Sequence, residues 1–240
     1  MKATYGTGCF MLINTGEDRP VSGRAADHGR GAGEWQNDLR AGGLDLRGRS
    51  GDPVARREGL GITGGPRAAE ALGASRRRPT TASWSCPPSP AWARPGGMPR
   101  RRGGIFGLTR DAGLPEIAAA TFDPCALQSR DLIEATRTDA PSAFGEAAQM
   151  RIDGGMSRSL WFSQRLADLT GIPVRRASYE ETTALGAALF AGVGAGLYAS
   201  SRGGRRGQSG GRDPRRRRSS AHEREAAYAR WLDAVPRVRL

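Results

Sequence analysis

Residues 151–174 read RIDGGMSRSLWFSQRLADLTGIPV, and they give the clearest indication of the fold. Its apolar pattern predicts a short strand over Gln149–Ile152, followed by a glycine turn over Asp153–Gly155. An amphipathic helix is predicted over Ser157–Leu169, and a second strand over Pro173–Arg175. Strand, turn, helix and strand in this order indicate an α/β fold.

The segments on either side continue this pattern. Residues 3–15 read ATYGTGCFMLINT, which predicts a strand, a glycine turn and a second strand. Leu114–Ala140 has helical composition, but Pro124 within it predicts a kink, because an interior proline costs a helix about 3 kcal/mol. Glu180–Leu197 predicts a helix whose small alanine and glycine face permits close packing.

Basic residues are concentrated in two segments. The 240 residues include 37 basic and 24 acidic ones, giving a net charge of +13, and Lys2 is the single lysine. Residues 17–102 hold 16 arginines and 9 acidic residues, and residues 201–218 hold 8 arginines and 1 acidic residue. Residues 103–200, in contrast, hold 8 arginines and 11 acidic residues. Such a charge by itself favours nucleic acid or an anionic surface as a partner. Both basic segments are rich in Arg, Gly, Pro or Ser and lack apolar periodicity. We therefore expect them to be disordered, and we expect Pro79–Arg102 in particular to form no packed element.

Composition also argues against several classes of protein. No apolar run approaches the roughly 18 residues that a membrane-spanning helix needs, and the N-terminus lacks the pattern of a secretory signal. The three cysteines, Cys9, Cys86 and Cys125, form neither a disulfide framework nor a CxxC metal pair. We therefore expect a cytoplasmic protein without a membrane partner, in which Cys9 is a small core residue.

Two glycine turns are candidate sites for a phosphate or a nucleotide. Gly6 and Gly8 flank Thr7, so that backbone N–H groups and a hydroxyl can face a phosphate oxygen. Gly154 and Gly155 lie between a strand and a helix start, which carries unsatisfied N–H groups and a partial positive charge. Each turn alone also suits a tight structural connection, so the residues leave both interpretations open.

In combination, these segments resemble the glycerol kinases within the FGGY family of carbohydrate kinases. The resemblance covers about half of the chain and includes the GTG, DGG and TALGAA patterns; it rests on Lys2–Gly16, Gly103–Arg110, Leu127–Ala135, Arg151–Val174 and Glu180–Leu197. It implies the C-terminal, nucleotide-binding domain of that family, which has an actin-like ATPase fold built on a ribonuclease H-like sheet.

The resemblance also implies the residues of an ATP site. Thr7, between the glycines of its turn, matches the threonine that contacts the nucleotide phosphates. Gly155, directly after Gly154, matches the glycine that lies against the adenosine. Ser159 stands where the family commonly has an asparagine at the adenine, so we expect a weaker contact there.

The activity implied is transfer of a phosphoryl group from ATP to glycerol, with Mg²⁺, giving sn-glycerol 3-phosphate and ADP. The general base is expected upstream of the chain, and glycerol would be bound by an N-terminal domain that we expect to be absent. No catalytic or metal-ligating residue is therefore assigned, and we expect no measurable kinase activity from this chain alone. The resemblance leaves open a homo-oligomer in the intact enzyme.

Three other interpretations are weighed against this one. The chain could derive from another FGGY sugar kinase that acts on a pentulose or a hexulose. It could be a basic RNA- or DNA-binding module built on a degenerate kinase. It could also be a non-functional pseudogene product with incidental polyanion binding.

Shifts of the reading frame account for the arginine-rich segments. With GC-rich codons, Ala82–Pro99 read from the third base of its first codon gives VVVVPAFTGLGAPWWDA, which resembles the family stretch that precedes GLTR. Leu44–Ala55 read from the second base gives WIFVAGAAIQW, a family nucleotide motif, and the written frame resumes at Glu58. On this interpretation the charge results from out-of-frame codons, so no specific nucleic-acid partner is expected.

The sequence thus predicts four parts. Residues 1–16 begin the C-terminal kinase domain with the GTG turn, and residues 17–102 are disrupted and largely out of frame. Residues 103–200 form the core of the nucleotide-binding domain. Residues 201–240 comprise an arginine-rich tail and a closing helix.

Overall fold

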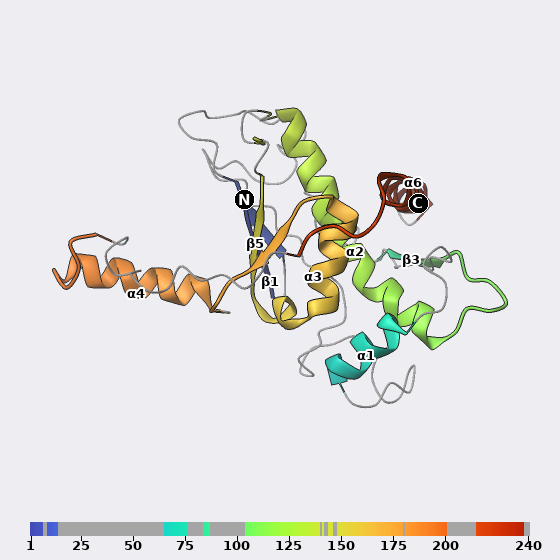
Figure 1. Cartoon of the computed structure of the whole chain (residues 1–240), viewed down its shortest axis with the longest axis horizontal. Coiled ribbons are helices and arrows are strands. Elements are labelled where there is room, and N and C mark those ends of the chain that lie inside the picture. Colours follow the sequence, from blue (N-terminus) through green and yellow to red (C-terminus); the bar gives the residue numbers. More distant parts are fainter. Residues whose placement is uncertain are drawn as a thin grey trace, which may run out of the picture.

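The computed structural model describes residues 1–6, 9–13, 65–75, 84–86, 104–139, 141, 144–145, 148–179, 181–200 and 215–237 (Figure 1). In chain order the elements are β1 (Lys2–Tyr5), β2 (Cys9–Leu12), α1 (Gly65–Ala74), β3 (Trp84–Cys86), β4 (Gly104–Phe106), α2 (Leu114–Asp139), β5 (Met150–Asp153), the 3₁₀ helix η5 (Gly155–Arg158), α3 (Leu160–Thr170), β6 (Val174–Arg176), α4 (Thr182–Gly194) and α6 (Ala221–Arg237).

A mixed four-stranded sheet with the order β2-β1-β5-β6 is the centre of the fold. β1 pairs with β2 antiparallel and with β5 parallel, and β5 pairs with β6 parallel. Helix α2 lies in the connection that leads to β5, and α3 connects β5 to β6. Parallel neighbours require such helical crossovers, so the observed topology confirms the α/β fold predicted from the helix and strand pattern.

One face of the sheet forms the core. Residues alternate along β1, so that Ala3 and Tyr5 are buried while Lys2 and Thr4 lie on the opposite face. The buried set continues across the sheet and onto the helices; it includes Cys9, Met11, Met150, Ile152, Val174, Leu127, Ile133, Phe162 and Leu166. The expectation that Cys9 is a core residue is confirmed, and burial raises the pKa of its thiol well above the usual range.

Helices α2 and α3 cover this face and are joined by an ion pair. The Arg165 side chain donates from Nε to Asp123 Oδ1 and from Nη2 to Asp123 Oδ2, both at 2.7 Å. Helix α2 is continuous through Pro124, which is fully buried, so the proline does not end the helix. The predicted helix over Leu114–Ala140 therefore matches α2 to within one residue at its C-terminal end.

The expectation that residues 79–102 form no packed element is wrong, and α4 does not use the close packing that its small residues permit. Three residues of the low-complexity stretch 79–102 form β3, which pairs antiparallel with β4, since any non-proline residue has a backbone N–H and C=O that can pair. Helix α4 does not pack closely through its small residues, since Phe190 is 71% exposed and only Leu189 and Gly192 of the helix are buried. Figure 1 shows α4 projecting away from the sheet and from α2 and α3.

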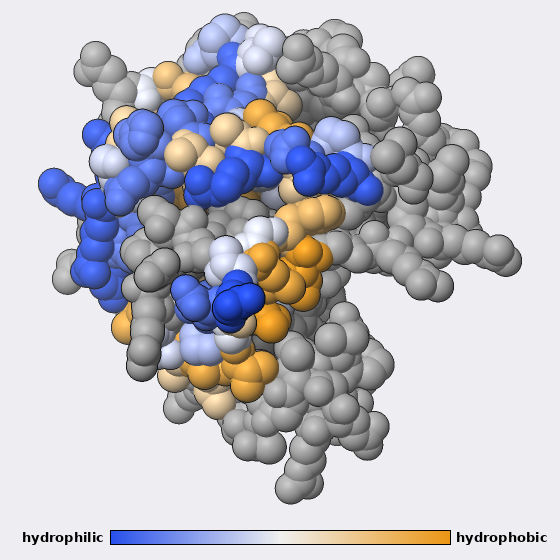
Figure 2. Space-filling model, turned by 90° about the vertical axis from the view of Figure 1, so that its right-hand side faces the viewer, coloured by the Kyte–Doolittle hydropathy of each residue, from blue (hydrophilic) through white to orange (hydrophobic). Residues whose placement is uncertain are grey.

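Large apolar side chains are also exposed elsewhere. Figure 2 shows the face that lies on the right in Figure 1, where hydrophilic residues predominate at the top and left and hydrophobic residues predominate from the centre downward. Leu108 is 53% exposed, and Leu197, after α4, is 75% exposed. None of the helices in the described part of the chain has the length and apolar content needed to cross a bilayer.

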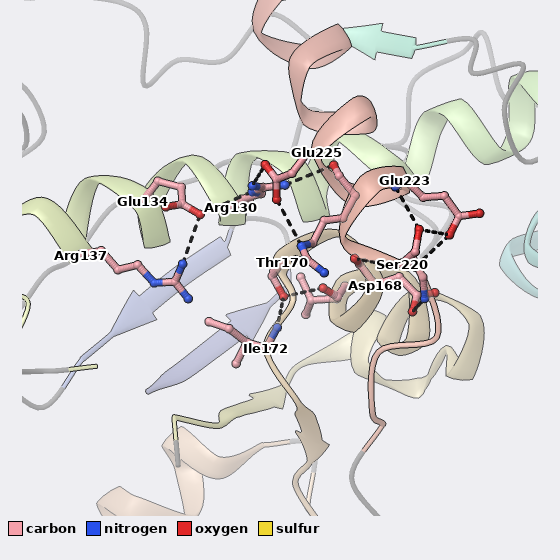
Figure 3. Close-up of polar contacts among 12 residues, drawn as sticks. Arg130, Glu134, Arg137, Asp168, Thr170, Ile172, Ser220, Glu223 and Glu225 are labelled. Atoms are coloured by element: carbon pink, nitrogen blue, oxygen red, sulfur yellow. Dashed lines mark hydrogen bonds and ion pairs between the residues drawn. The ribbon is translucent and has the colours of Figure 1, made fainter. Parts of the chain in front are cut away.

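The segment before α6 is anchored to α3 and β6 through its backbone. Arg215 forms a two-way antiparallel bridge with Val174, at 2.7 and 2.9 Å. Asp168 Oδ1 accepts hydrogen bonds from the backbone N–H groups of Arg218 and Ser219 (Figure 3). These contacts place residues 215–219, part of the predicted arginine-rich tail, against the domain.

Helix α6 then packs on α2 through a polar cluster. Arg130 donates to Glu225 Oε2 at 2.6 Å, and its guanidinium carbon lies 4.0 Å from the centre of the Tyr228 ring. Asp131 accepts hydrogen bonds from the Tyr228 hydroxyl and the Trp231 indole, each at 2.8 Å. The closing helix expected within residues 201–240 is therefore present in the structure as α6.

The start of α6 gives a pH-dependent prediction. Ser220 and Glu223 form a reciprocal capping box: Ser220 N–H and Oγ donate to Glu223 Oε2, and Glu223 N–H donates to Ser220 Oγ. The backbone hydrogen bond from Ser220, followed by the one from its side chain, lowers the pKa of Glu223 below its usual value of 4.5.

Because this pKa is lower in the folded state, the stabilising contribution of Glu223 is present above pH 4.5 and is lost as the pH falls through the folded-state pKa. Glu223→Gln should therefore lower the free energy of unfolding at pH 7 and have a smaller effect at pH 3. Urea unfolding of both proteins at the two pH values measures this. A difference that is the same at both would contradict the assignment.

Candidate nucleotide-binding site

The two glycine turns singled out in the sequence meet at one edge of the sheet. β1 and β5 are parallel neighbours, with Thr4 opposite Asp153, so their carboxyl ends lie side by side. Gly6 follows β1, and Gly154 and Gly155 follow β5. Ligands of open α/β sheets bind at the carboxyl ends of the strands, and this edge is therefore the candidate site.

Gly154 is the point of closest approach between the turns. Its φ is +84°, in the left-handed region that favours glycine, and a Cβ atom added there would lie 2.4 Å from Tyr5 O. Only a residue without a side chain fits at this position. The first glycine of the DGG motif thus has a packing role between β1 and β5, which the sequence alone does not distinguish from a ligand-binding role.

Tyr5 holds the end of β1 in place beneath this contact. Its hydroxyl lies 2.7 Å from Ser129 Oγ on α2, and Ser129 Oγ donates to Cys125 O. The Tyr5 ring packs edge-to-face against Phe162 of α3, with the ring centres 5.0 Å apart. Burial raises the pKa of the Tyr5 hydroxyl well above its usual value, so this anchor is neutral.

The start of α3 has fewer free donors than the sequence suggested. Ser159 is the N-cap residue, and its Oγ accepts a hydrogen bond from Phe162 N–H at 2.8 Å. Glu70 Oε1 of α1 accepts from Trp161 N–H at 3.1 Å. The Ser159 hydroxyl, predicted to contact adenine, is therefore engaged in capping, and two N–H groups of α3 are already satisfied without an anion.

Asp153, the first residue of the DGG motif, is a feature of the site that sequence reasoning did not assign. Its side chain is 2% exposed and lies 3.0 Å from Lys2 Nζ of β1. Its Oδ2 also accepts a hydrogen bond from Thr182 Oγ1, at the start of α4. The alternation along β1 and β5 could have indicated that Lys2 and Asp153 share a face, but Thr182 is too distant in sequence to be connected with them.

The structure places four of the six predicted site residues: Gly6, Gly154, Gly155 and Ser159. Thr7 and Gly8 lie outside the described residues. Among the described residues, a Cβ atom at Gly6 would meet no atom within 4 Å. Within the described segments, no group of three His, Cys, Asp or Glu side chains could hold a metal ion.

Comparison with known proteins agrees with this fold. Residues 1–195 match the sequence model of the FGGY family of carbohydrate kinases, C-terminal domain. The chain therefore belongs to this family, and it corresponds to the C-terminal half of FGGY kinases.

Among its curated relatives, the glycerol kinase of Ectopseudomonas mendocina is 38% identical over 242 residues, which are 100% of this chain and 47% of that protein. The chain thus spans about half the length of the curated relatives it matches.

Two solved structures share the fold. The crystal structure of Plasmodium falciparum glycerol kinase with ADP superposes with a TM-score of 0.73 at 22% identity, covering 100% of this chain and 47% of that one. Gluconate kinase from Lactobacillus acidophilus gives 0.64 at 16% identity, covering 99% and 46%. These likenesses confirm the predicted actin-like ATPase fold of the FGGY kinases.

Proposed function

We propose that this chain is the nucleotide-binding half of a glycerol kinase-like phosphotransferase and that it binds ATP and ADP at the meeting point of the two glycine turns. The observation that carries the proposal is the contact of Gly154 with Tyr5 O, which brings the turns together. Glycine turns at adjacent strand ends allow the backbone to approach phosphate groups closely. The ADP complex of the Plasmodium falciparum relative supports a nucleotide as the ligand.

The complete reaction would transfer a phosphoryl group from ATP to glycerol. In-line transfer requires both substrates to be held in register, and the described residues supply neither a general base nor a glycerol site that we can assign. Mg²⁺ would enter together with ATP, because this ion is usually held by one or two carboxylates and the substrate phosphates. No group of three metal-ligating side chains lies within the described residues, and we assign no protein ligand to the ion. The curated relatives are glycerol kinases, which favours glycerol over a pentulose or a hexulose as the acceptor of the phosphoryl group.

Calorimetric titration of the whole chain with ADP tests the proposal. We expect saturable binding with a dissociation constant below about 1 mM, corresponding to roughly −4 kcal/mol. Gly6→Ala should weaken ADP binding about tenfold. The added methyl group would keep the phosphate away from the backbone of the turn, so that one or two hydrogen bonds to the phosphate are lost. No glycerol-dependent ADP formation is expected.

Two results would contradict the proposal. If the folded chain releases no heat with ADP or ATP, it is not a nucleotide-binding domain. If Gly6→Ala binds ADP as tightly as the unmodified chain, the ligand does not lie at the GTG turn. Glycerol-dependent turnover by the purified chain would overturn the expectation that it is inactive alone.

A further inference from the structure

The buried carboxylate of Asp153 lies directly before the Gly154–Gly155 turn and connects three elements. It belongs to β5, its Oδ2 is 3.0 Å from Lys2 Nζ of β1, and the same oxygen accepts from Thr182 Oγ1 of α4. Lys2 in turn donates to Thr4 Oγ1. The start of α4 is thereby tied to the residue that begins the glycine turn.

The stability of the fold does not explain this carboxylate. Oδ1 of Asp153 is buried and has no hydrogen-bond partner among the described residues. A buried ion pair gains little over apolar side chains of similar size, and an unsatisfied oxygen adds a desolvation cost. The Asp153 carboxylate is costly to bury and lies next to the Gly154–Gly155 turn. We therefore look for its role in the geometry of that turn.

The turn itself has few internal hydrogen bonds. Ser157 N–H and Oγ both donate to Gly154 O, at 3.0 and 2.7 Å. Gly154 has a left-handed backbone that a glycine can leave readily, because no side chain restricts it. The orientation of the turn therefore depends on the residue before it, whose side chain is held by Lys2 and Thr182.

We propose that Asp153, held by Lys2 and Thr182, is a positioning residue that fixes the Gly154–Gly155 turn for the nucleotide and couples this turn to the start of α4. The inference rests on the proposed nucleotide site and deepens it. Binding of a nucleotide at the turn then stabilises the contact between Thr182 and Asp153, and the orientation of α4 depends on whether the site is occupied.

Three variants of the whole chain separate this role from a general effect on folding. Thr182→Val removes the hydroxyl group and keeps the shape of the side chain, whereas Thr182→Ser keeps the hydroxyl group. Thr183→Val is the matched control, because Thr183 is the next residue of α4 and is exposed. Amide hydrogen exchange and the ADP dissociation constant are measured for each.

For Thr182→Val we expect faster exchange at the Ser157 amide, no change at amides in the middle of α2, and about tenfold weaker ADP binding, as for the loss of one hydrogen bond to a charged group. Thr182→Ser should keep the Ser157 exchange rate and the ADP dissociation constant of the unmodified chain, and Thr183→Val should change neither of them.

The proposal is overturned if Thr182→Val exchanges and binds like Thr183→Val. It is also overturned if exchange rises equally at Ser157 and throughout α2, because the tie is then merely structural. If the unmodified chain binds no nucleotide, the proposed function fails, and the role of Asp153 in nucleotide binding fails with it. If binding is intact and only the Thr182 comparison fails, the proposed function stands without this inference.

Discussion

Gly154→Ala is expected to destabilise the protein by roughly 3 kcal/mol or more. The left-handed backbone at this position costs an alanine about 1–2 kcal/mol, and the steric overlap of its Cβ atom adds a similar or larger cost. The overlap is with backbone: the new Cβ would lie 2.4 Å from Tyr5 O and 2.7 Å from Tyr5 C. Neither atom can move without separating β1 from β5. Since small domains have only about 5–15 kcal/mol of net stability, this is a large fraction of the total.

Gly6→Ala is the matched control for this variant. Gly6 lies at the adjacent turn, but a Cβ there would meet no atom of the structurally described segments within 4 Å. Its effect on the free energy of unfolding should stay within about 1 kcal/mol, the range for replacing a glycine whose conformation alanine can adopt. Urea unfolding followed by circular dichroism measures both variants. Equal stabilities for the two would contradict the close approach of the turns.

Asp123→Asn is the second variant with a large expected effect, a loss of about 3–5 kcal/mol, because it removes the carboxylate that forms two hydrogen bonds to the buried Arg165 guanidinium. The two side chains are 3% and 18% exposed and are joined by two hydrogen bonds of 2.7 Å. Burial alone would lower the pKa of Arg165, but the adjacent carboxylate raises it above its usual value, so the arginine remains charged.

An exposed ion pair of the same length provides the comparison. Arg237 Nη2 lies 2.7 Å from Asp233 Oδ2 in α6, but these side chains are 59% and 65% exposed. Solvent screens this pair, so Asp233→Asn should change the free energy of unfolding by less than about 1 kcal/mol. Denaturant unfolding of both variants at pH 7 tests the contrast. If the Asp123 and Asp233 variants lose similar stability, burial does not determine the strength of these pairs.

The pattern of apolar residues was sufficient to predict the central elements. The strand, glycine turn, helix and strand expected around residues 149–175 correspond to β5, η5, α3 and β6, with boundaries shifted by one to three residues. Such local periodicity is a direct consequence of burying one face of a helix or a strand. It also gave the two glycine turns, whose meeting follows from the parallel pairing of β1 and β5.

Contacts between distant residues could not be predicted in this way. Glu70 caps the first turn of α3 from α1, and Thr182 reaches Asp153 from α4. Neither partner has a local signal, because both depend on how the helices are placed in space. Ser159 illustrates the same limit: a serine before a helix suits capping as well as ligand binding, and the structure shows the capping hydrogen bond from Phe162.

The frame-shift interpretation concerns mainly residues outside the described part of the chain, and it stays a hypothesis that resequencing of the gene would decide. Residues 84–86 are an exception, since they lie in a stretch interpreted as out of frame and still pair with β4. The family match nevertheless extends over residues 1–195, across both proposed shifts in residues 17–102. On the frame-shift hypothesis, the arginine-rich composition of that region results from out-of-frame codons, and no specific nucleic-acid partner is expected.

The proposed function requires that a nucleotide binds where the two glycine turns meet. Adding ADP to the ¹⁵N-labelled chain and following its amide resonances tests whether this binding occurs. We predict saturable shifts of the Gly6, Gly154 and Gly155 resonances, with little change in α6. The absence of shifts, or shifts confined to residues away from the ends of β1 and β5, would contradict the claim.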